Sequence, residues 1–374
     1  MARLEDVCSI NMGQSPESSS YNEAGKGIPF FQGNADFGKL HPTVRVWCDA
    51  PTKIAEQGDI LISVRAPIGA LNIADVQCCI GRGLAALTVN ERLCYQKYLW
   101  YALECKVDEL NSKGTGSTFK AINKKTLAET EIPLPPLDEQ RRIAAVLDKV
   151  SDLIAKRREQ LDKLDELVKA RFVEMFGDPV SNPYNWEKVP LSELADIRIG
   201  PFGSLLHKED YIEGGHPLVN PSHIIDGKIV IDEKLTVSHQ KYIELEAYHL
   251  KAGDVVMGRR GEMGRCAVVS QEGLLCGTGS LLIRPKGKVT ADYIQKIISF
   301  PSFKKMIEDM AVGQTMPNLN VPIVSAFKII KPPMQVQENY YTFVTQVDKS
   351  KLTIQQSLDK LEVLKKALMQ QYFG

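Results

Sequence analysis

The sequence lacks the features of membrane-spanning and disulfide-bonded proteins. No apolar run approaches the roughly 20 residues that a membrane span needs, and the chain begins MARLEDVCSI, without a basic-then-apolar leader. Its eight cysteines show no CxxC spacing, so buried thiols in a reducing cytoplasm are expected rather than disulfides or a zinc site. The formal net charge is zero, so any binding of nucleic acid must depend on local charge.

Catalytic motifs are also missing. The stretches GTGSTFKA and GRRGEMG lack the order GxxxxGKS or GxxxxGKT of a phosphate-binding loop, and no GxGxxG opens a helix after a strand. The six histidines include no HExxH motif and no i, i+4 pair, and no GxSxG elbow occurs. Asn182-Pro183-Tyr184 resembles part of the asparagine–proline–aromatic motif of base methyltransferases, but it lacks the second proline and is interpreted as a linker turn. We therefore expect a chain that is not an enzyme and that holds no catalytic residue, metal or cofactor.

The most informative feature present is an internal repeat. Residues 132–177 and 329–374 align without a gap at an offset of 197 residues. The matching pairs are Pro135-Pro136 with Pro332-Pro333, Gln140 with Gln337, Leu161-Asp162-Lys163-Leu164 with Leu358-Asp359-Lys360-Leu361, and Phe176-Gly177 with Phe373-Gly374. With 374 residues, 44% hydrophobic and 25% charged, the chain is long enough for two copies of a domain-plus-helix unit.

Each repeated stretch carries a heptad pattern. In the first copy the apolar seam consists of Ile143, Leu147, Val150, Ile154, Leu161, Leu164, Val168 and Met175. Arg157 and Arg171 fill the two gaps in this seam, where the second copy has Ile354 and Leu368. The pattern predicts long helices at 138–177 and 334–374 that pair as an antiparallel coiled coil. At 1.5 Å per residue, a helix of about 36 residues spans roughly 54 Å.

The segments before the helices, 1–137 and 178–333, are interpreted as two copies of one small domain. Short β-branched runs separated by Gly and Pro predict a hairpin at Gly58–Asp75, and Tyr95–Asn111 has the apolar spacing of a helix. Gly253–Gly264 repeats the start of that hairpin at an offset of 195 residues. The predicted fold class is α+β, with two repeated domains separated by paired long helices and related by an approximate two-fold axis.

Loops that place Arg, Lys, Asn and Gln beside glycine recur in both domains. Such loops can approach a phosphate backbone closely and place amides and guanidiniums at base edges. A solvated surface loop is the alternative explanation for any single residue. We predict DNA contacts by Gln32, Asn34, Arg65, Arg82, Lys120, Asn123, Asn220, Arg259, Arg260, Gln314 and Asn318. Arg65 and Arg260 occupy equivalent positions, in the loops SVRAPIG and GRRGEMG.

The start of the first long helix carries a family resemblance. Ile132–Gln140 (IPLPPLDEQ) and Arg142-Ile143-Ala144, supported by Gly116–Lys120 and Gly58–Leu61, are similar to motifs of the specificity subunit of type I restriction–modification enzymes. The resemblance extends over the whole chain. The second copy departs from the pattern, because Gln335–Asn339 (QVQEN) replaces the usual acidic-glutamine sequence.

The resemblance implies target-recognition domains at 1–137 and 178–333, each reading one half of a bipartite DNA target, and spacer helices at 138–177 and 334–374. It also implies a scaffold that holds two modification (methyltransferase) subunits, with restriction (endonuclease and translocase) subunits joining to form the nuclease. S-adenosylmethionine, ATP and Mg²⁺ are then expected in those partner subunits. Such a complex defends the cell against foreign DNA.

Two other functions are compatible with this sequence. The chain is a pure assembly scaffold if its domains bind protein rather than DNA, or a stand-alone DNA-binding regulator if it reads a split site alone. A specificity subunit needs methyltransferase partners and a regulator does not, so copurification distinguishes these functions.

Overall fold

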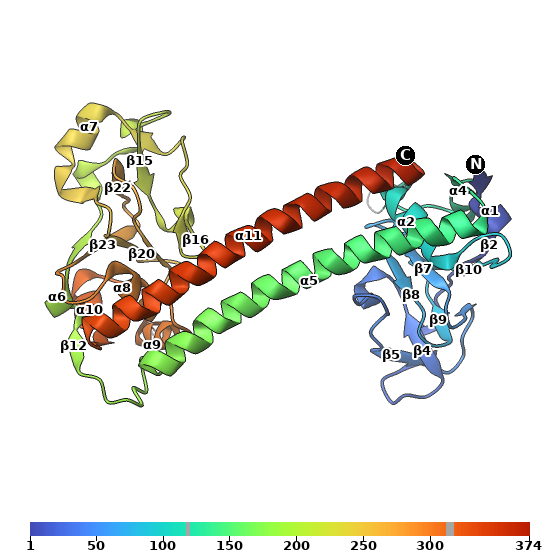
Figure 1. The fold of residues 1–374 in the computed structure, drawn as a ribbon, viewed down its shortest axis with the longest axis horizontal. Helices are drawn as coiled ribbons and strands as arrows, with labels where there is room; N and C mark the ends of the chain where they lie inside the picture. The colour runs from blue at the N-terminus through green and yellow to red at the C-terminus, as the bar shows by residue number, and fades with distance from the viewer. Residues whose placement is uncertain (117–119, 312–317) are drawn as a thin grey trace. The chain divides into compact units, whose positions relative to one another are not determined.

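The computed structural model describes residues 1–116, 120–311 and 318–374. The chain forms two compact units, which are Met1–Leu161 with Thr353–Gly374 (unit 1) and Asp162–Leu352 (unit 2). Two 40-residue helices, α5 (Leu137–Phe176) and α11 (Met334–Phe373), each contribute to both units (Figure 1). Each compact unit therefore contains a globular part and a part of each long helix. Among the described residues, every helix is too short or too polar to cross a membrane.

Unit 1 is built on two small sheets. Its elements before α5 are β1 Ala2–Arg3, α1 Leu4–Val7, β2 Cys8–Met12, β3 Tyr21–Asn22, β4 Ile28–Phe31, β5 Val46–Cys48, β6 Ile54–Ala55, β7 Ile60–Ser63, β8 Leu71–Ile73, β9 Cys78–Ile80, β10 Leu84–Val89, α2 Gln96–Cys105, α3 Val107–Ser112, α4 Lys124–Ala128 and β11 Glu131–Ile132. The strand orders are β2-β10-β7-β8, which is antiparallel throughout, and β3-β5-β4-β9-β6, in which β4 and β9 are parallel. Strands β1 and β11 pair separately.

Unit 2 repeats this topology. Its elements between the long helices are β12 Lys188–Pro190, α6 Leu191–Leu194, β13 Ala195–Ile199, β14 Tyr211–Ile212, β15 His216–Val219, β16 Ile224–Ile225, β17 Lys228–Ile229, β18 Thr236–Val237, α7 His239–Glu244, β19 His249–Leu250, β20 Val255–Gly258, β21 Cys266–Val268, β22 Leu274–Cys276, β23 Ser280–Pro285, α8 Ala291–Ile298, α9 Pro301–Ala311, α10 Val321–Ser325 and β24 Lys328–Ile330. The orders β13-β23-β20-β21 and β14-β18-β15-β22-β19 match those of unit 1, with β15 and β22 parallel. The hairpin β16–β17 is added. The predicted α+β fold with two repeated units is confirmed, and their two-fold relation stays a prediction.

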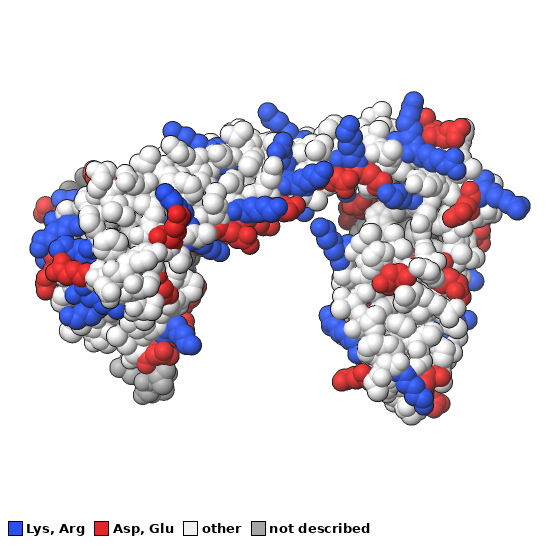
Figure 2. Space-filling view, turned by 60° about the horizontal axis from the view of Figure 1, so that its bottom comes forward, with Lys and Arg blue, Asp and Glu red and all other residues white. Residues whose placement is uncertain are grey.

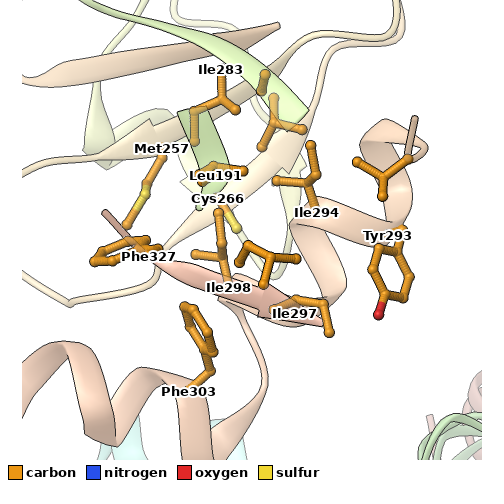
Figure 3. Packing of buried hydrophobic residues seen from close by; sticks show 14 of the residues in the cluster. Leu191, Met257, Cys266, Ile283, Tyr293, Ile294, Ile297, Ile298, Phe303 and Phe327 are labelled. Atoms are coloured by element: carbon orange, nitrogen blue, oxygen red, sulfur yellow. The ribbon is translucent and has the colours of Figure 1, made fainter. Parts of the chain in front are cut away.

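The core of each unit joins a sheet to the long helices. In unit 2, Leu191, Met257 and Ile283 converge from α6, β20 and β23 on the apolar face of α8 (Figure 3). Phe176 of α5 belongs to the same core and packs edge-on against Tyr293, with ring centroids 5.2 Å apart. The ends of the long helices are thus held by the domains that they adjoin, and burial of this apolar surface is the main force that stabilises each unit.

The long helices pair antiparallel within each unit. In unit 1, Val150 and Ile154 of α5 contact Leu358 of α11. In unit 2, Asp165 pairs with Lys351. The apolar seam predicted for α5 is confirmed at its buried members, which are Ile143, Leu147, Val150, Ile154 and Val168. Side chains of both charge signs are interspersed over the visible surface, as expected of a solvated face (Figure 2).

The two arginines in the seam are accommodated without a buried acid. The Nη1 atom of Arg157 donates to Gln160 and that of Arg171 donates to Glu174, both at 2.8 Å. The Arg171 guanidinium also lies over the ring of Phe343, 5.7 Å from its centroid, a distance at which a cation is attracted to an aromatic face. The Nε atoms of both arginines are buried without a hydrogen-bond partner in the described part of the chain.

A buried glutamine fixes the start of each long helix. Gln140 Oε1 accepts from the backbone N–H of Tyr95 at 2.8 Å, and its Nε2 donates to the carbonyls of Leu93 (3.0 Å) and Pro135 (2.8 Å). Gln337 makes the matching bonds in unit 2, to the backbone N–H of Thr290 (3.2 Å) and the carbonyl of Pro332 (3.0 Å). The repeated Pro-Pro-x-x-x-Gln sequence is thus explained by packing of the helix start against the domain.

One predicted helix is divided. The apolar spacing over Tyr95–Asn111 predicts a single helix, whereas the structure has α2 and α3, separated at Lys106. Lys106 adopts ψ 2°, outside the helical range, and α3 is turned so that Asn111 Nδ2 donates to the carbonyl of Ile68 at 2.9 Å. A contact with a distant loop therefore overrides the local helical pattern.

The thiols are buried as the sequence predicts. All eight cysteines are free, and only Cys105 is partly exposed. Burial raises the pKa of Cys8, Cys94 and Cys266 to about 12, which leaves these thiols protonated and unreactive near neutral pH. Within residues 1–116, 120–311 and 318–374, no three His, Cys, Asp or Glu side chains gather in a metal-binding arrangement.

Candidate nucleic-acid interface

Four loops of unit 1 are joined by backbone hydrogen bonds into one surface, which we call the unit 1 loop cluster. It consists of Gln32–Asn34, Val64–Ala66, Gly81–Gly83 and Lys120–Ile122. The bonds run from Gly83 N to Gln32 O (3.1 Å), Val64 N to Gly83 O (2.9 Å), Ile122 N to Val64 O (2.9 Å) and Ala66 N to Lys120 O (3.0 Å). Segments far apart in the sequence thus meet at the ends of β4, β7 and β9.

Glycine makes this close approach possible. A Cβ atom on Gly83 would lie 2.5 Å from the carbonyl oxygen of Gln32, and a Cβ atom on Gly81 would lie 3.0 Å from the Cα of Gln32. The sequence Gly81-Arg82-Gly83 therefore has room for only one side chain, which is the exposed Arg82. The backbone N–H of Arg82 is held by Ser15 Oγ at 3.3 Å.

The unit 1 loop cluster brings three cations together. Arg65, Arg82 and Lys120 are all exposed, and the backbone of Arg65 bridges that of Ala121, next to Lys120. Ser63 Oγ donates to the Arg65 carbonyl at 2.7 Å and so fixes the turn. Among the ion pairs of the described residues, none involves these three side chains. Unpaired cations on rigid loops can bind anions without first breaking an internal ion pair.

Unit 2 has an equivalent surface, the unit 2 loop cluster, consisting of Val219–Asn220, Gly258–Arg260, Gly277–Gly279 and Asn318–Leu319. Its bonds run from Gly277 N to Val219 O (3.0 Å), Arg259 N to Gly279 O (3.0 Å) and Leu319 N to Arg259 O (2.9 Å). The two bonds of the Arg259 backbone match the two that the Val64 backbone makes in unit 1. The next residues, Arg65 and Arg260, are therefore structurally equivalent, as predicted.

The side chains of the unit 2 loop cluster differ from those of unit 1. Arg259 stands where unit 1 has Val64, and its Nε donates to Asn318 Oδ1 at 3.1 Å. Burial lowers the pKa of Arg259, and the neighbouring charge of Arg260 lowers it further. Arg260 is exposed. Two adjacent cations on this surface repel each other, which favours the binding of an anion.

The predicted amide residues lie at the edges of these surfaces. Gln32 is exposed at the end of β4, and Asn34 begins a short 3-10 helix. Asn220 directly precedes another, Pro221–His223, and its backbone N–H donates to His223 Nδ1 at 3.3 Å. Gln314 lies outside the described residues. Contacts of these residues with DNA stay predictions.

Asn123 has a structural role that the sequence analysis did not include. Its Oδ1 accepts from the backbone N–H of Thr126 at 2.9 Å and so caps helix α4. Asn320 caps α10 in the same way, through the backbone N–H of Ile323 at 3.0 Å. Recurrence of this asparagine in both units is therefore explained by helix capping.

Some basic residues near the loops are already neutralised. Lys113 pairs with Glu109 at 2.6 Å, and Arg265 pairs with Glu262 at 2.9 Å. Bonds from Lys113 and Lys106 lower the pKa of Glu109. Lys113 follows the last turn of α3, and its partner Glu109 lies one helical turn earlier.

Comparisons with known proteins give one consistent result. The family described as type I restriction modification DNA specificity domain matches residues 1–165 and 183–365. A protein assigned as the MjaX specificity subunit of Methanocaldococcus jannaschii is 44% identical over 165 residues, which cover 44% of this chain and 39% of that relative. The type I restriction enzyme MjaIX specificity subunit of the same organism is 22% identical over 98% of this chain and 90% of its own length.

Solved structures share the fold. The type I restriction–modification S subunit from M. genitalium superposes with a TM-score of 0.60 at 17% identity, over 100% of this chain and 95% of that one. A chain from a study of complex assembly and conformational transition in the type I R-M system gives a TM-score of 0.67 at 19% identity, over 99% and 96%.

Proposed function

Because this chain belongs to the family of type I restriction modification DNA specificity domains, we propose that it is the sequence-specific DNA-binding subunit of a type I restriction–modification complex. Units 1 and 2 each read one half of a bipartite target. The observation that carries this proposal is the pair Arg65 and Arg260, exposed and structurally equivalent in the two loop clusters.

The loop clusters have the chemistry that DNA recognition requires. Exposed Arg and Lys side chains attract phosphates, which supplies affinity without sequence preference. Guanidinium and amide groups at base edges supply sequence preference. The rigid backbone bonding within each cluster places both kinds of group with little loss of entropy on binding.

The chemistry of the complex belongs to its partners in this proposal. Two modification (methyltransferase) subunits and the restriction subunits bind to this chain in the cytoplasm and carry S-adenosylmethionine, ATP and Mg²⁺. The specificity-subunit names of the M. jannaschii relatives support this assignment. The chain itself then catalyses neither methylation nor cleavage.

Methylation profiling of cellular DNA tests the proposal. Cells that produce the modification subunits with this chain should methylate one bipartite sequence, and cells that lack this chain should not. The purified chain supplied with S-adenosylmethionine should transfer no methyl group. A complex that assembles with the chain but methylates without regard to sequence would indicate an assembly scaffold. Specific DNA binding without methyltransferase partners in the cell would indicate a regulator.

A further inference from the structure

We infer that Arg259 reads a guanine in the half-site bound by unit 2, that Asn318 is its positioning residue, and that the neighbouring Arg260 contacts a phosphate. This inference rests on the proposed function and deepens it, because it assigns different roles to two adjacent arginines. The assignment follows from how each arginine is held.

Arg259 is held at its backbone and at its Nε atom. Its backbone N–H donates to the Gly279 carbonyl at 3.0 Å, and its carbonyl accepts from the backbone N–H of Leu319 at 2.9 Å. Its Nε donates to Asn318 Oδ1 at 3.1 Å. The Nη1 and Nη2 atoms form no hydrogen bond with the described residues. These two nitrogens form the fork that matches O6 and N7 of guanine, the commonest base-specific contact of arginine in the major groove.

Arg260 is held much less. Its side chain is exposed and makes no ion pair or hydrogen bond with the described residues. Gly261, with φ 80°, follows it in a tight turn. A long side chain with this freedom suits a phosphate, which accepts a cation from many directions and carries no sequence information.

Unit 1 provides an internal comparison. The equivalent of Arg259 is Val64, and the equivalent of Asn318 is Ala121, because Ile122 N bonds to Val64 O as Leu319 N bonds to Arg259 O. Both members of the polar pair are therefore replaced by apolar residues in a unit with the same fold. The shared fold does not need the pair, which favours a role in reading the unit 2 half-site.

The energetics of the free protein agree with this role. Partial burial and the adjacent Arg260 both disfavour the charged form of Arg259, as the lowered pKa indicates. The acceptor atoms of guanine and a nearby phosphate relieve both costs in the complex. The bond to Asn318 keeps the guanidinium oriented before DNA arrives, so little side-chain entropy is lost on binding.

Binding measurements on the full complex test the inference. The target is first determined by methylation profiling, and duplexes are then made in which each base pair is replaced in turn. Arg259→Ala should reduce discrimination at one G·C pair by roughly 10- to 100-fold and leave other positions unchanged. Arg259→Lys, which lacks the fork, should have nearly the same effect. Asn318→Ala should weaken discrimination at the same position by a smaller factor.

Arg260→Ala is the matched control. It should weaken binding to all duplexes alike and reduce the slope of log K against log salt by about 0.9, as expected for one lost phosphate contact. Unit 2 of every variant is checked by thermal unfolding followed through Trp186.

Several results would overturn the inference. One is a unit 2 half-site without a G·C pair. Another is Arg259→Ala weakening every duplex equally, or lowering the unfolding temperature while discrimination is retained, since Arg259 would then be structural. If the wild-type complex itself shows no sequence preference, the proposed function fails. If the wild type discriminates and Arg259→Ala discriminates equally well, only this inference fails.

Discussion

The buried Gln140 allows a sharp test of how the long helix is joined to unit 1. The side chain is 0% exposed, and its amide makes three hydrogen bonds, of which two link the start of α5 to the loop before α2 and one joins the carbonyl of Pro135 just before α5. Gln140→Ala removes all three and leaves one N–H and two carbonyls without partners. Gln140→Met removes the same bonds while it keeps most of the side-chain volume.

The magnitude follows from the number of bonds. Each intramolecular hydrogen bond contributes about 0.5–1.5 kcal/mol net, and each buried group left unpaired costs about 1–3 kcal/mol. Water will reach some of the carbonyls that lose their bond to Gln140, so we expect the free energy of unfolding of unit 1 to fall by about 2–4 kcal/mol. Gln337, also 0% exposed, makes two such bonds. Its replacement should lower the stability of unit 2 by about 1–3 kcal/mol.

The tryptophans allow each unit to be followed separately. Trp47 and Trp100 lie in unit 1, and Trp186 lies in unit 2. Urea unfolding of variants that keep Trp100 alone or Trp186 alone reports each transition by fluorescence. Gln140→Met should shift the Trp100 transition as far as Gln140→Ala does, and Gln337→Ala should shift only that of Trp186. A Gln140→Met protein within about 0.5 kcal/mol of wild type would refute the reasoning, because three lost buried bonds must cost more.

The remaining predictions concern the interface, one lysine and the helices. Arg65→Ala or Arg260→Ala should weaken DNA binding and lower the salt slope by about 0.9 each if they contact phosphates; unchanged affinity and slope in both would exclude them from the interface. Burial and two neighbouring lysines lower the pKa of Lys296 in the folded chain below its ordinary 10.5. At pH values between this lowered pKa and 10.5 the unfolded chain binds more protons than the folded chain, so wild-type stability rises with pH. Lys296→Met should remove that rise and raise the unfolding temperature at neutral pH; equal pH profiles would contradict this. Deleting Leu161–Leu167 together with Leu358–Leu364 removes about 10 Å of each helix. We expect the methylated half-sequences to persist with a gap about three base pairs shorter, and an active complex with the original gap would show that the helices do not set it.

The helices were the most predictable part of the fold. The heptad pattern and the Pro-Pro boundary predict helices at 138–177 and 334–374, and α5 and α11 run over Leu137–Phe176 and Met334–Phe373. The hairpin expected at Gly58–Asp75 is also present, as β7 and β8. These features depend on contacts between near neighbours in the sequence, which periodicity records directly.

Contacts between distant segments were not predictable in the same way. The parallel pairing of β4 with β9 joins segments separated by β5 to β8, and no local pattern specifies it. The division between α2 and α3 depends on Asn111 reaching Ile68. The bond between Arg259 and Asn318 joins two residues that were each proposed for the interface without any sign that they touch.

Comparison of the two units distinguishes residues that maintain the shared fold from residues that contact DNA. The recurrence of a residue in both sequences does not make this distinction by itself. Asn123 and Asn320 recur because both cap helices, and Gln140 and Gln337 recur because both satisfy buried backbone groups. All four side chains bond to backbone groups of their own unit, so the shared fold determines them.

Outward-facing positions in the loop clusters behave differently. Arg65 and Arg260 recur, as expected for contacts with phosphates, which are the same in every DNA sequence. Arg82 and Thr278, both exposed at equivalent places between the paired glycines, differ, and the buried Val64 of unit 1 is replaced by the partly exposed Arg259 in unit 2. Two units that share a scaffold but read different half-sites must differ at the residues that contact bases. The positions that face outward and differ between the units are therefore where sequence preference is to be sought first.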